Sequence, residues 1–454
     1  MAMALYSLLL LAVFVLGAPY WLALMLFSPE DRGRYRAGLW GRLGRVPAEL
    51  RDTAAGKQVV WIHAVSVGEV LAATRLVAEL ETRLAAEFGG DWIIAVSTTT
   101  ATGQALARER FAAGAGVAGR VFWYPLDFAW AVRAYLNVLQ PKLLVLMESE
   151  LWPRMLVECR RRGVPVAVVN ARVSDRSYRR GLRVKAVWGR VLRWVNMFLA
   201  QSEEDGRRLV AMGARAEAVR VVGNLKYDVR AVRESALARQ FLAVLDGYSL
   251  VVAGSTLPGE EEAILDIWRR VQEATSGATR TKEGSVLPML VIAPRHPDRF
   301  EQVRRLIFKR GYSPLLCSQL LRTPAEAWFI TGEVILLLDT IGDLAAAYGV
   351  ARVAFVGGSL VKRGGHNPLE PAQFGVPVAM GPSFENFRDV VGKMQAADGI
   401  RIVQDEDELE AALVDLLTDR EKARAMGERG RRVFEEQQGA TGRVVEALIE
   451  LVRR

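Results

Sequence analysis

Short apolar runs alternate with amphipathic stretches along most of the chain. Six runs in the first half are almost continuously apolar, as in strands buried on both faces of a parallel sheet: 58–63, 92–97, 121–124, 143–147, 166–170 and 197–201. A second series predicts strands at 249–253, 289–293, 334–338, 353–356, 376–380 and 400–403. Helical patterns such as 260–273 and 298–310 separate them. This alternation predicts two doubly wound α/β units.

The two series define the expected domains. A polar stretch between them predicts Rossmann-like domains at 29–225 and 247–430, joined by a linker at 226–246. The helical region 431–454 is expected to pack back toward the N-terminal domain. Ligands of open parallel sheets bind beyond the carboxyl ends of the strands, so we expect the two domains to face each other across a substrate cleft.

The N-terminal segment follows a different pattern. Residues 1–28 contain no charged side chain, and the apolar run 5–27 would span about 30–35 Å as a helix, close to the thickness of a bilayer core. A cleaved signal peptide is the alternative, but the basic n-region is missing and the run is long for that purpose. Excess Arg and Lys after residue 31 marks a cytoplasmic flank. We therefore expect a single-pass membrane anchor at 1–28, with the remainder of the chain cytoplasmic.

Charge and cysteine content narrow the class of partner and compartment. The chain has 60 Lys and Arg against 51 Asp and Glu, a formal net charge of +9, which favours a nucleic acid, an anionic membrane or a phosphorylated substrate. Cys159 and Cys317 lie far apart without a CxxC or a Cys/His cluster, which indicates neither a disulfide framework nor a zinc site. A reducing compartment fits both cysteines.

Carboxylates follow two of the predicted strands in the first half. Ser66 and Glu69 come just after the strand 58–63, at the expected start of a helix. Ser-x-x-Glu there is typical of a helix cap, and Glu69 could instead act as a general base. Glu148 and Glu150 directly follow the strand 143–147. Two more acids at a strand end suggest a tuned acid/base environment or hydroxyl binding.

A basic segment follows the strand 166–170. Arg172, Arg176, Arg179 and Arg180 begin an amphipathic stretch that also contains Trp188 and Trp194. Such a stretch is often a solvated helix face. Beside a membrane it would suit the phosphates of lipid headgroups.

Candidate phosphate-binding residues follow strands of the second half. Small residues with free N–H groups and a fixed guanidinium suit a leaving phosphate, and a carboxylate at a helix start can accept ribose hydroxyls. A tight turn is the structural alternative. The candidates are Ser255, Thr256, Arg295, His296, Gly357, Gly358, Ser359, Asn367 and Glu370. Asp405-Glu406-Asp407 has a metal-binding DxD spacing but is better explained as a helix cap.

Together the motifs resemble a known enzyme family. HAVSVGE, ESELWPR, NARVSDRS, GNLKYD, AGST, PRHPDRF and GGSLVKRGGHNPLEP with GPSFENF occur in this order between residues 63 and 387. The set is similar to the 3-deoxy-D-manno-octulosonic acid (Kdo) transferases of lipopolysaccharide assembly. Seven ordered motifs are far more specific than any single one. Leu257-Pro258 and Lys362-Arg363 depart from the family pattern and leave the nucleotide-side detail open.

The resemblance implies an α/β GT-B fold and inverting transfer of Kdo from CMP-Kdo to a lipid A precursor, lipid IVA, without cofactor or catalytic metal. Glu69 would be the base, and Glu148, Glu150 and Lys226 would line the cleft. Ser255, Thr256, Arg295, His296, Gly357, Gly358, Ser359, Asn367 and Glu370 would bind the nucleotide sugar. Ser66, Arg172, Arg176, Arg179 and Arg180 would face the acceptor and an anionic membrane. No nucleic-acid partner is expected, and the location would be the inner membrane.

Three alternatives remain open at this stage. The nearest is a GT-B transferase that uses another nucleotide sugar and lipid. A membrane-anchored lipid hydrolase would use Ser66 as the nucleophile, served by His296 or His366, because Ala64-Val65-Ser66-Val67-Gly68 resembles a nucleophile elbow. A non-catalytic membrane scaffold is the third.

Overall fold

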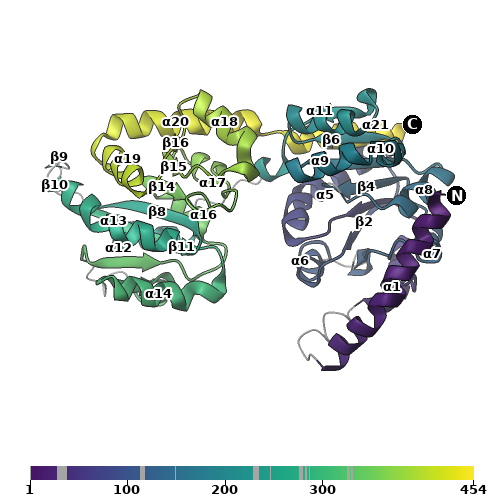
Figure 1. The fold of residues 1–454 in the computed structure, drawn as a ribbon, viewed down its shortest axis with the longest axis horizontal. Helices are drawn as coiled ribbons and strands as arrows, with labels where there is room; N and C mark the ends of the chain where they lie inside the picture. Colours follow the sequence, from purple (N-terminus) through teal and green to yellow (C-terminus); the bar gives the residue numbers. More distant parts are fainter. Residues whose placement is uncertain are drawn as a thin grey trace. The chain divides into compact units, whose positions relative to one another are not determined.

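The computed structural model describes residues 2–27, 38–112, 118–148, 150–228, 235–245, 247–275, 280–281, 284–285, 287–324, 328 and 331–454. The chain divides into two compact units. Unit 1 comprises Met1–Val229 and Gln438–Arg454, and unit 2 comprises Arg230–Gln437 (Figure 1). Each unit is built on its own sheet, so each is considered by itself.

Unit 1 contains a parallel sheet of seven described strands in the order β3-β2-β1-β4-β5-β6-β7. Their bounds are β1 Gln58–His63, β2 Trp92–Thr98, β3 Val121–Trp123, β4 Leu143–Met147, β5 Val166–Ala171, β6 Met197–Ala200 and β7 Val219–Val221. The strand order reverses between β1 and β4, which pair side by side. This reversal is the topological switch point at which doubly wound sheets bind ligands.

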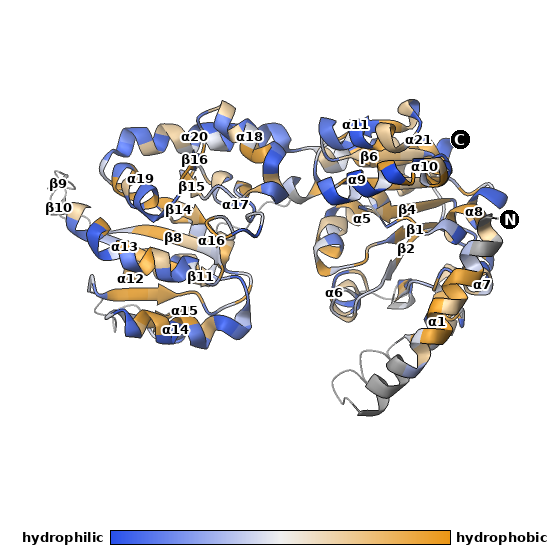
Figure 2. Cartoon of the chain, in the orientation of Figure 1, coloured by the Kyte–Doolittle hydropathy of each residue, from blue (hydrophilic) through white to orange (hydrophobic). Residues whose placement is uncertain are grey.

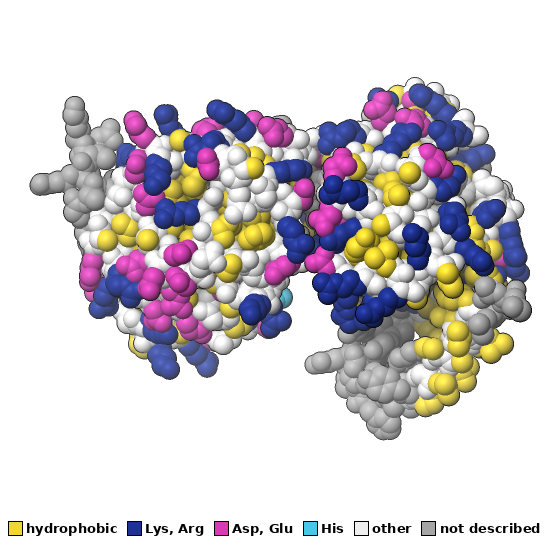
Figure 3. All heavy atoms as spheres, turned by 45° about the horizontal axis from the view of Figure 1, so that its top comes forward, with side chains coloured by type: hydrophobic (Ala, Val, Ile, Leu, Met, Phe, Trp, Pro, Cys, Tyr) yellow, Lys and Arg dark blue, Asp and Glu magenta, His cyan; other side chains and the backbone are white. Residues whose placement is uncertain are grey.

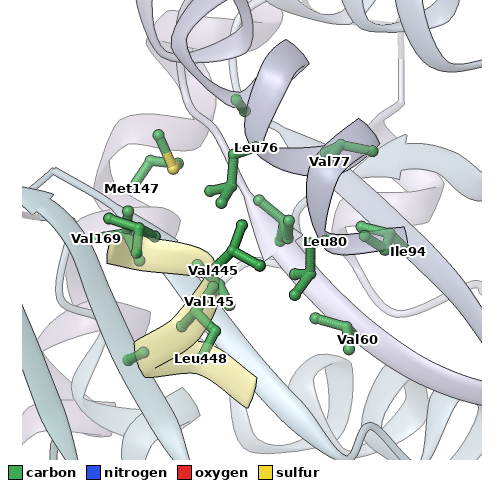
Figure 4. Close-up of a cluster of buried hydrophobic side chains, with 14 of the residues drawn as sticks. Val60, Leu76, Val77, Leu80, Ile94, Val145, Met147, Val169, Val445 and Leu448 are labelled. Atoms are coloured by element: carbon green, nitrogen blue, oxygen red, sulfur yellow. The ribbon is translucent and has the colours of Figure 1, made fainter. Parts of the chain in front are cut away.

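Helices cover the sheet of unit 1. They are α1 Ala2–Phe27, α3 Leu39–Arg42, α4 Ala48–Ala54, α5 Val67–Phe88, α6 Ala101–Phe111, α7 Ala129–Leu139, α8 Pro153–Arg161, α9 Asp175–Arg183, α10 Lys185–Leu192, α11 Glu203–Met212 and α21 Ala440–Arg453, with 3-10 turns η1 Ala118–Arg120, η2 Ala216–Ala218 and η3 Leu225–Asp228. One apolar core joins α5, α21 and one face of the strands; Leu76 and Leu80 of α5 meet Val445 and Leu448 of α21 over Val145 (Figure 4). The C-terminal helix therefore completes a core begun near the N-terminus.

Unit 2 repeats the architecture. Its seven-stranded parallel sheet, among the described residues, has the order β12-β13-β11-β8-β14-β15-β16. The strand bounds are β8 Tyr248–Thr256, β11 Leu287–Pro294, β12 Ser313–Leu316, β13 Val334–Leu337, β14 Val353–Val356, β15 Val378–Met380 and β16 Arg401–Ile402, besides a small hairpin of β9 Arg280–Thr281 and β10 Gly284–Ser285. Here the order reverses between β8 and β14.

The helices of unit 2 are α12 Ala236–Val244, α13 Glu260–Thr275, α14 Phe300–Lys309, α15 Cys317–Leu320, α16 Leu344–Gly349, α17 Leu369–Ala372, α18 Arg388–Ala396, α19 Glu406–Thr418 and α20 Arg420–Gln437, with 3-10 turns η4 Pro297–Arg299 and η6 Glu385–Phe387. Helix α12 lies within the segment assigned to the linker, and its Leu237 and Phe241 are buried in the core of unit 2. Asp405 caps α19 by accepting a hydrogen bond from the Glu408 N–H at 2.9 Å, which confirms the capping interpretation.

The chain leaves unit 1 after η3 and returns to it before α21. Asp228 of η3 is 2% exposed, and its carboxylate accepts hydrogen bonds from the N–H groups of Gly439 and Thr441 at the start of α21. The Asp228 carbonyl also accepts a hydrogen bond from Arg75 of α5. One buried carboxylate thus ties the returning segment to the departing one.

The N-terminal segment forms the 26-residue helix α1, which Figure 2 shows as largely apolar where it is coloured. Within the described residues, however, no helix has the length and hydropathy needed to cross a bilayer. The expected single-pass anchor at 1–28 is therefore not supported. Two polar groups of α1 bind other parts of unit 1: Tyr6 donates to Asp127 at 2.8 Å, and Ser7 accepts from Arg154 at 2.7 Å.

Candidate active site

The carboxylates of unit 1 gather at the switch point of its sheet. Glu69 lies in the first turn of α5, which follows β1, and Glu148 and Glu150 follow β4. Because β1 and β4 are neighbours, three acids from distant sequence positions meet at one sheet edge. Glu148 and Glu150 both raise the pKa of Glu69 through their charges, which confirms that the three are close.

Glu69 is buried and has two hydrogen-bond donors among the described residues. Its side chain is 7% exposed, and it accepts one hydrogen bond from the Val65 N–H at 2.8 Å and one from the Ser66 hydroxyl at 3.0 Å. Burial is the main cause that raises its pKa to about 7, and the two acidic neighbours add to the shift. A carboxyl with this pKa has the proton affinity of an effective general base near neutral pH.

Ser66 has a different role from the cap that its sequence pattern predicts. It occupies the N-cap position of α5, but its side chain accepts no hydrogen bond from a helical N–H. Its hydroxyl donates to Glu69, and Glu69 in turn binds Val65, one residue before the cap. The reciprocal capping box is therefore not formed, and Ser66 helps to orient the carboxylate.

Glu148 and Glu150 differ in their surroundings. Glu148 has φ +57°, a left-handed conformation that is uncommon outside glycine, while its N–H stays bonded to Val169 of the neighbouring strand at 2.8 Å. Burial and the charge of Glu148 raise the pKa of Glu150. Lys226 belongs to η3, and its side chain lies outside the described part of the structure.

The basic residues of the segment after β5 are mostly exposed. Arg176, Arg179 and Arg180 lie on α9 and face solvent, whereas Arg172 is half-buried next to Asp205. Ser174 caps α9, and Arg208 of α11 binds both Asp175 and the Val173 carbonyl. A fixed helix therefore presents a row of guanidinium groups. Figure 3 shows abundant Lys and Arg on the face of unit 1 seen there.

The second cluster lies at the switch point of unit 2. Ser255 and Thr256 end β8, and Gly357, Gly358 and Ser359 directly follow its neighbour β14. The two segments are in close contact: a Cβ on Gly357 would lie 2.6 Å from the Ser255 carbonyl oxygen. Ser255 has φ +57°. Glycine is required at position 357 by this packing within unit 2.

Three N–H groups of the Gly357–Leu360 loop already have a carboxylate partner. Glu260, at the first position of α13, accepts hydrogen bonds from Gly358 at 2.7 Å, Ser359 at 2.9 Å and Leu360 at 3.0 Å. It also accepts one from Leu257 at 2.9 Å and is 0% exposed. The N–H groups that the sequence pattern assigns to a ligand phosphate are thus bonded to a carboxylate of the same unit.

The adjacent Glu261 performs a similar task for a second loop. It forms a buried ion pair with Arg299, with an Nη1–Oε1 distance of 2.7 Å, and accepts a hydrogen bond from Thr256 at 2.9 Å. Burial raises the pKa of Glu261, while Arg299 and Thr256 lower it. Arg299 belongs to the motif PRHPDRF, so Glu261 fixes the loop after β11 to the end of β8.

Arg295, His366 and Glu370 form the titratable part of the second cluster. The backbone N–H of Arg295 donates to Thr256 at 3.0 Å, and its side chain and that of His296 are exposed. Burial, followed by the charges of Arg295 and His296, lowers the pKa of His366 to about 4. Burial raises the pKa of Glu370, which Arg295 and the hydrogen-bonded Asn367 partly offset. A cation therefore stands beside a neutral imidazole and a carboxyl group.

Two functional features escaped the sequence analysis. Glu260 and Glu261 were included only as the start of a helical stretch, since acids in a first turn are favourable there on general grounds. The available signal was three consecutive glutamates after Gly259, shortly after a strand end.

Across the described residues, no group of three or more His, Cys, Asp or Glu has the arrangement needed to hold a metal ion.

Comparisons with known proteins identify the family of the chain. Residues 37–229 match the family profile described as 3-deoxy-D-manno-octulosonic-acid transferase. The transferase of that name from Haemophilus influenzae is 33% identical over 94% of this chain and 93% of its own length. The Bordetella pertussis transferase is 32% identical over 92% of this chain and 94% of its own length.

Solved structures show the fold. The UDP complex of S. aureus MnaA has a TM-score of 0.51 and 14% identity, over 87% of this chain and 98% of its own. A UDP-N-acetylglucosamine 2-epimerase has a TM-score of 0.53 and 13% identity, over 88% and 98%. Both support a GT-B-like fold, with two parallel-sheet α/β units. With the sequence relatives spanning nearly the whole chain, the protein belongs to the 3-deoxy-D-manno-octulosonic acid transferase family.

Proposed function

We propose that this Kdo transferase takes Kdo from CMP-Kdo and adds it, with inversion, to a hydroxyl of a lipid A precursor, lipid IVA. The observation that carries the proposal is Glu69: a buried strand-end carboxyl with a pKa of about 7, held by Val65 and Ser66 beside two other acids. A sugar hydroxyl is a poor nucleophile, so the transfer needs a positioned base.

In this proposal the two units divide the chemistry. Glu69 of unit 1 removes the proton from the acceptor hydroxyl as its oxygen attacks the anomeric carbon of Kdo. The bond from that carbon to the phosphate breaks, and CMP leaves. Arg295 of unit 2 supplies the positive charge that stabilises the leaving phosphate, and Glu370 with Asn367 accepts hydrogen bonds from the nucleotide. Burial keeps the pKa of Glu69 high, and the charges of Glu148 and Glu150 raise it further.

The direct test is an assay of detergent-solubilised protein with CMP-Kdo and a tetra-acylated lipid A precursor, with product mass as the readout. A mass gain of one or more Kdo units supports the proposal and counts the transfers. Absence of product while CMP raises the melting temperature would reject this acceptor but keep the nucleotide site. Absence of both would reject the donor as well.

We also propose that unit 1 binds an anionic membrane surface. The exposed Arg176, Arg179 and Arg180 supply positive charge, and the exposed Leu8 and Leu16 of α1 supply apolar contact. Exposed charges are screened at a Debye length of about 8 Å in physiological salt. Binding to phosphatidylglycerol vesicles should therefore weaken as salt rises, and the triple Arg→Gln variant should lose this salt dependence. Salt-independent binding by the wild type would contradict the electrostatic part.

A further inference from the structure

Three successive backbone N–H groups of the loop Gly357–Leu360 converge on one carboxylate, and convergent N–H groups of this kind bind anions. Three of these groups, from Gly358, Ser359 and Leu360, converge on Glu260 at 2.7–3.0 Å. The Leu257 N–H, which follows β8, is a fourth donor at 2.9 Å. A wholly buried carboxylate with four N–H donors is fully satisfied and has no free lone pair directed at a ligand.

The loop held by Glu260 connects the other strand-end segments of unit 2. Gly357 N–H donates to Gly254 at the end of β8, and Gly357 and Gly358 carbonyls accept from His366 and Gly365. Ser359 accepts from Gly381 through its hydroxyl and from Ser383 through its carbonyl. The conformation of this loop therefore determines where the segments that contain His366 and Ser383 lie.

We infer that Glu260 is an internal anion that fills the backbone N–H site of the Gly357–Leu360 loop and positions the donor site around it. This rests on the proposed function in one respect, that unit 2 binds CMP-Kdo. It changes the assignment of Gly358 and Ser359, because their N–H groups bind the Glu260 carboxylate and not a phosphate. The donor phosphate must then find its positive charge elsewhere in unit 2, and Arg295 is an exposed cation of that cluster.

The test uses the full-length chain with Glu260→Ala, because this substitution leaves the four N–H groups and removes their partner. Hydrogen bonds to a charged group are worth about 1.5–3 kcal/mol, so KM for CMP-Kdo should rise about 10- to 100-fold while kcat with saturating donor changes less. Acetate or formate at high concentration should refill the vacancy, lower that KM and raise the melting temperature of the variant. Acetamide, which is similar in size but neutral, should do neither.

Glu262→Ala is the matched control. Glu262 lies in the same helical turn, is half-buried, and binds a single N–H, that of Gly259 at 2.9 Å. It should show neither the donor KM change nor the acetate response. If Glu260→Ala is too unstable to purify, Glu260→Gln keeps the shape and should show the same KM change in smaller measure, since an amide nitrogen would face at least one N–H donor.

The outcomes separate this inference from the proposed function. A folded Glu260→Ala with wild-type KM for CMP-Kdo would overturn the positioning role. Tighter binding of CMP by Glu260→Ala than by the wild type would also overturn it, because the N–H groups would then be receiving the donor phosphate. If acetate raises the melting temperature of Glu260→Ala while neither the variant nor the wild type binds CMP, the role of Glu260 as an internal anion is supported and CMP-Kdo is rejected as the donor.

Discussion

Both units place a buried carboxylate at the first turn of the helix after their first strand, and the two carboxylates behave in opposite ways. Glu69 of α5 accepts hydrogen bonds from two donors among the described residues and has two acidic neighbours, and burial is the main cause that raises its pKa to about 7. Glu260 of α13 has four N–H donors. Both side chains are buried, so the number of hydrogen-bond donors among the described residues is what distinguishes them: two at Glu69 and four at Glu260.

The largest expected effect concerns the reactive member of the pair. Glu69→Gln keeps the shape but cannot accept a proton, so kcat should fall about 10²- to 10⁴-fold, the usual contribution of a general base. CMP affinity measured by calorimetry should stay unchanged. Glu79→Gln, at a half-buried position of the same helix where the side chain pairs with Arg75, is the control and should retain full activity. Comparable turnover in Glu69→Gln would remove Glu69 as the base.

Replacing a carboxylate that is fully paired within unit 2 should instead lower the free energy of unfolding. Glu261→Gln would leave the charge of Arg299 buried and poorly paired, at a cost of about 3–5 kcal/mol in urea unfolding. At pH 8, Glu69→Gln should lose no stability, because folding raises the pKa of Glu69 and so disfavours its charged form above pH 7. Replacing both Glu261 and Arg299 by Leu and Met should recover much of the loss. Equal destabilisation by Glu69→Gln and Glu261→Gln would contradict the distinction between the two kinds of carboxylate.

A smaller effect is expected at the exposed cation of unit 2. Arg295→Ala should weaken CMP binding about 10-fold or more, since charge-assisted hydrogen bonds contribute about 1.5–3 kcal/mol. Acceptor KM should change little. Arg304→Ala, an exposed arginine of α14 paired with Glu301, serves as the control in the same titrations. Unchanged CMP affinity in Arg295→Ala would place the phosphate elsewhere.

The smallest effect sharpens the role of the acidic neighbours. Activity needs deprotonated Glu69, so kcat/KM should fall about tenfold per pH unit below an apparent pKa near 7. Removing the negative charge of Glu148 lowers that pKa, so Glu148→Gln should move the acid limb to lower pH, by less than about one unit. Glu150→Gln should move it less, because its charge has the smaller influence. A limb that moves to higher pH would contradict this electrostatic account.

Much of the fold could be predicted because its strands are buried on both faces. The predicted strands 58–63 and 143–147 coincide with β1 and β4, and the two parallel-sheet α/β units are confirmed. The edge strands β7 and β12 were missed. Val219–Val221 is largely exposed, and Ser313–Leu316 contains a proline, so neither shows the apolar run of a central strand.

The limits of prediction have identifiable causes. The apolar run 5–27 fits a membrane span by length. Its sequence alone does not show that Tyr6 binds Asp127 or that Ser7 binds Arg154, because each partner lies more than 120 positions away. Likewise, a Gly-Gly-Ser loop indicates an anion-binding site, but the group bound there is the carboxylate of Glu260, about a hundred residues earlier in the sequence. Local pattern gives the kind of site, whereas its occupant depends on long-range contacts.

Helix α21 gives unit 1 an unusual order of assembly during synthesis. Domains fold as units while the chain emerges from the ribosome, and N-terminal ones generally fold first. Here Val445 and Leu448 pack against Leu76 and Leu80, so unit 1 lacks part of its interior until α21 has been synthesised. Unit 2 can therefore finish folding before unit 1, and a truncated messenger would release a chain in which the unit that contains Glu69 is the incomplete one.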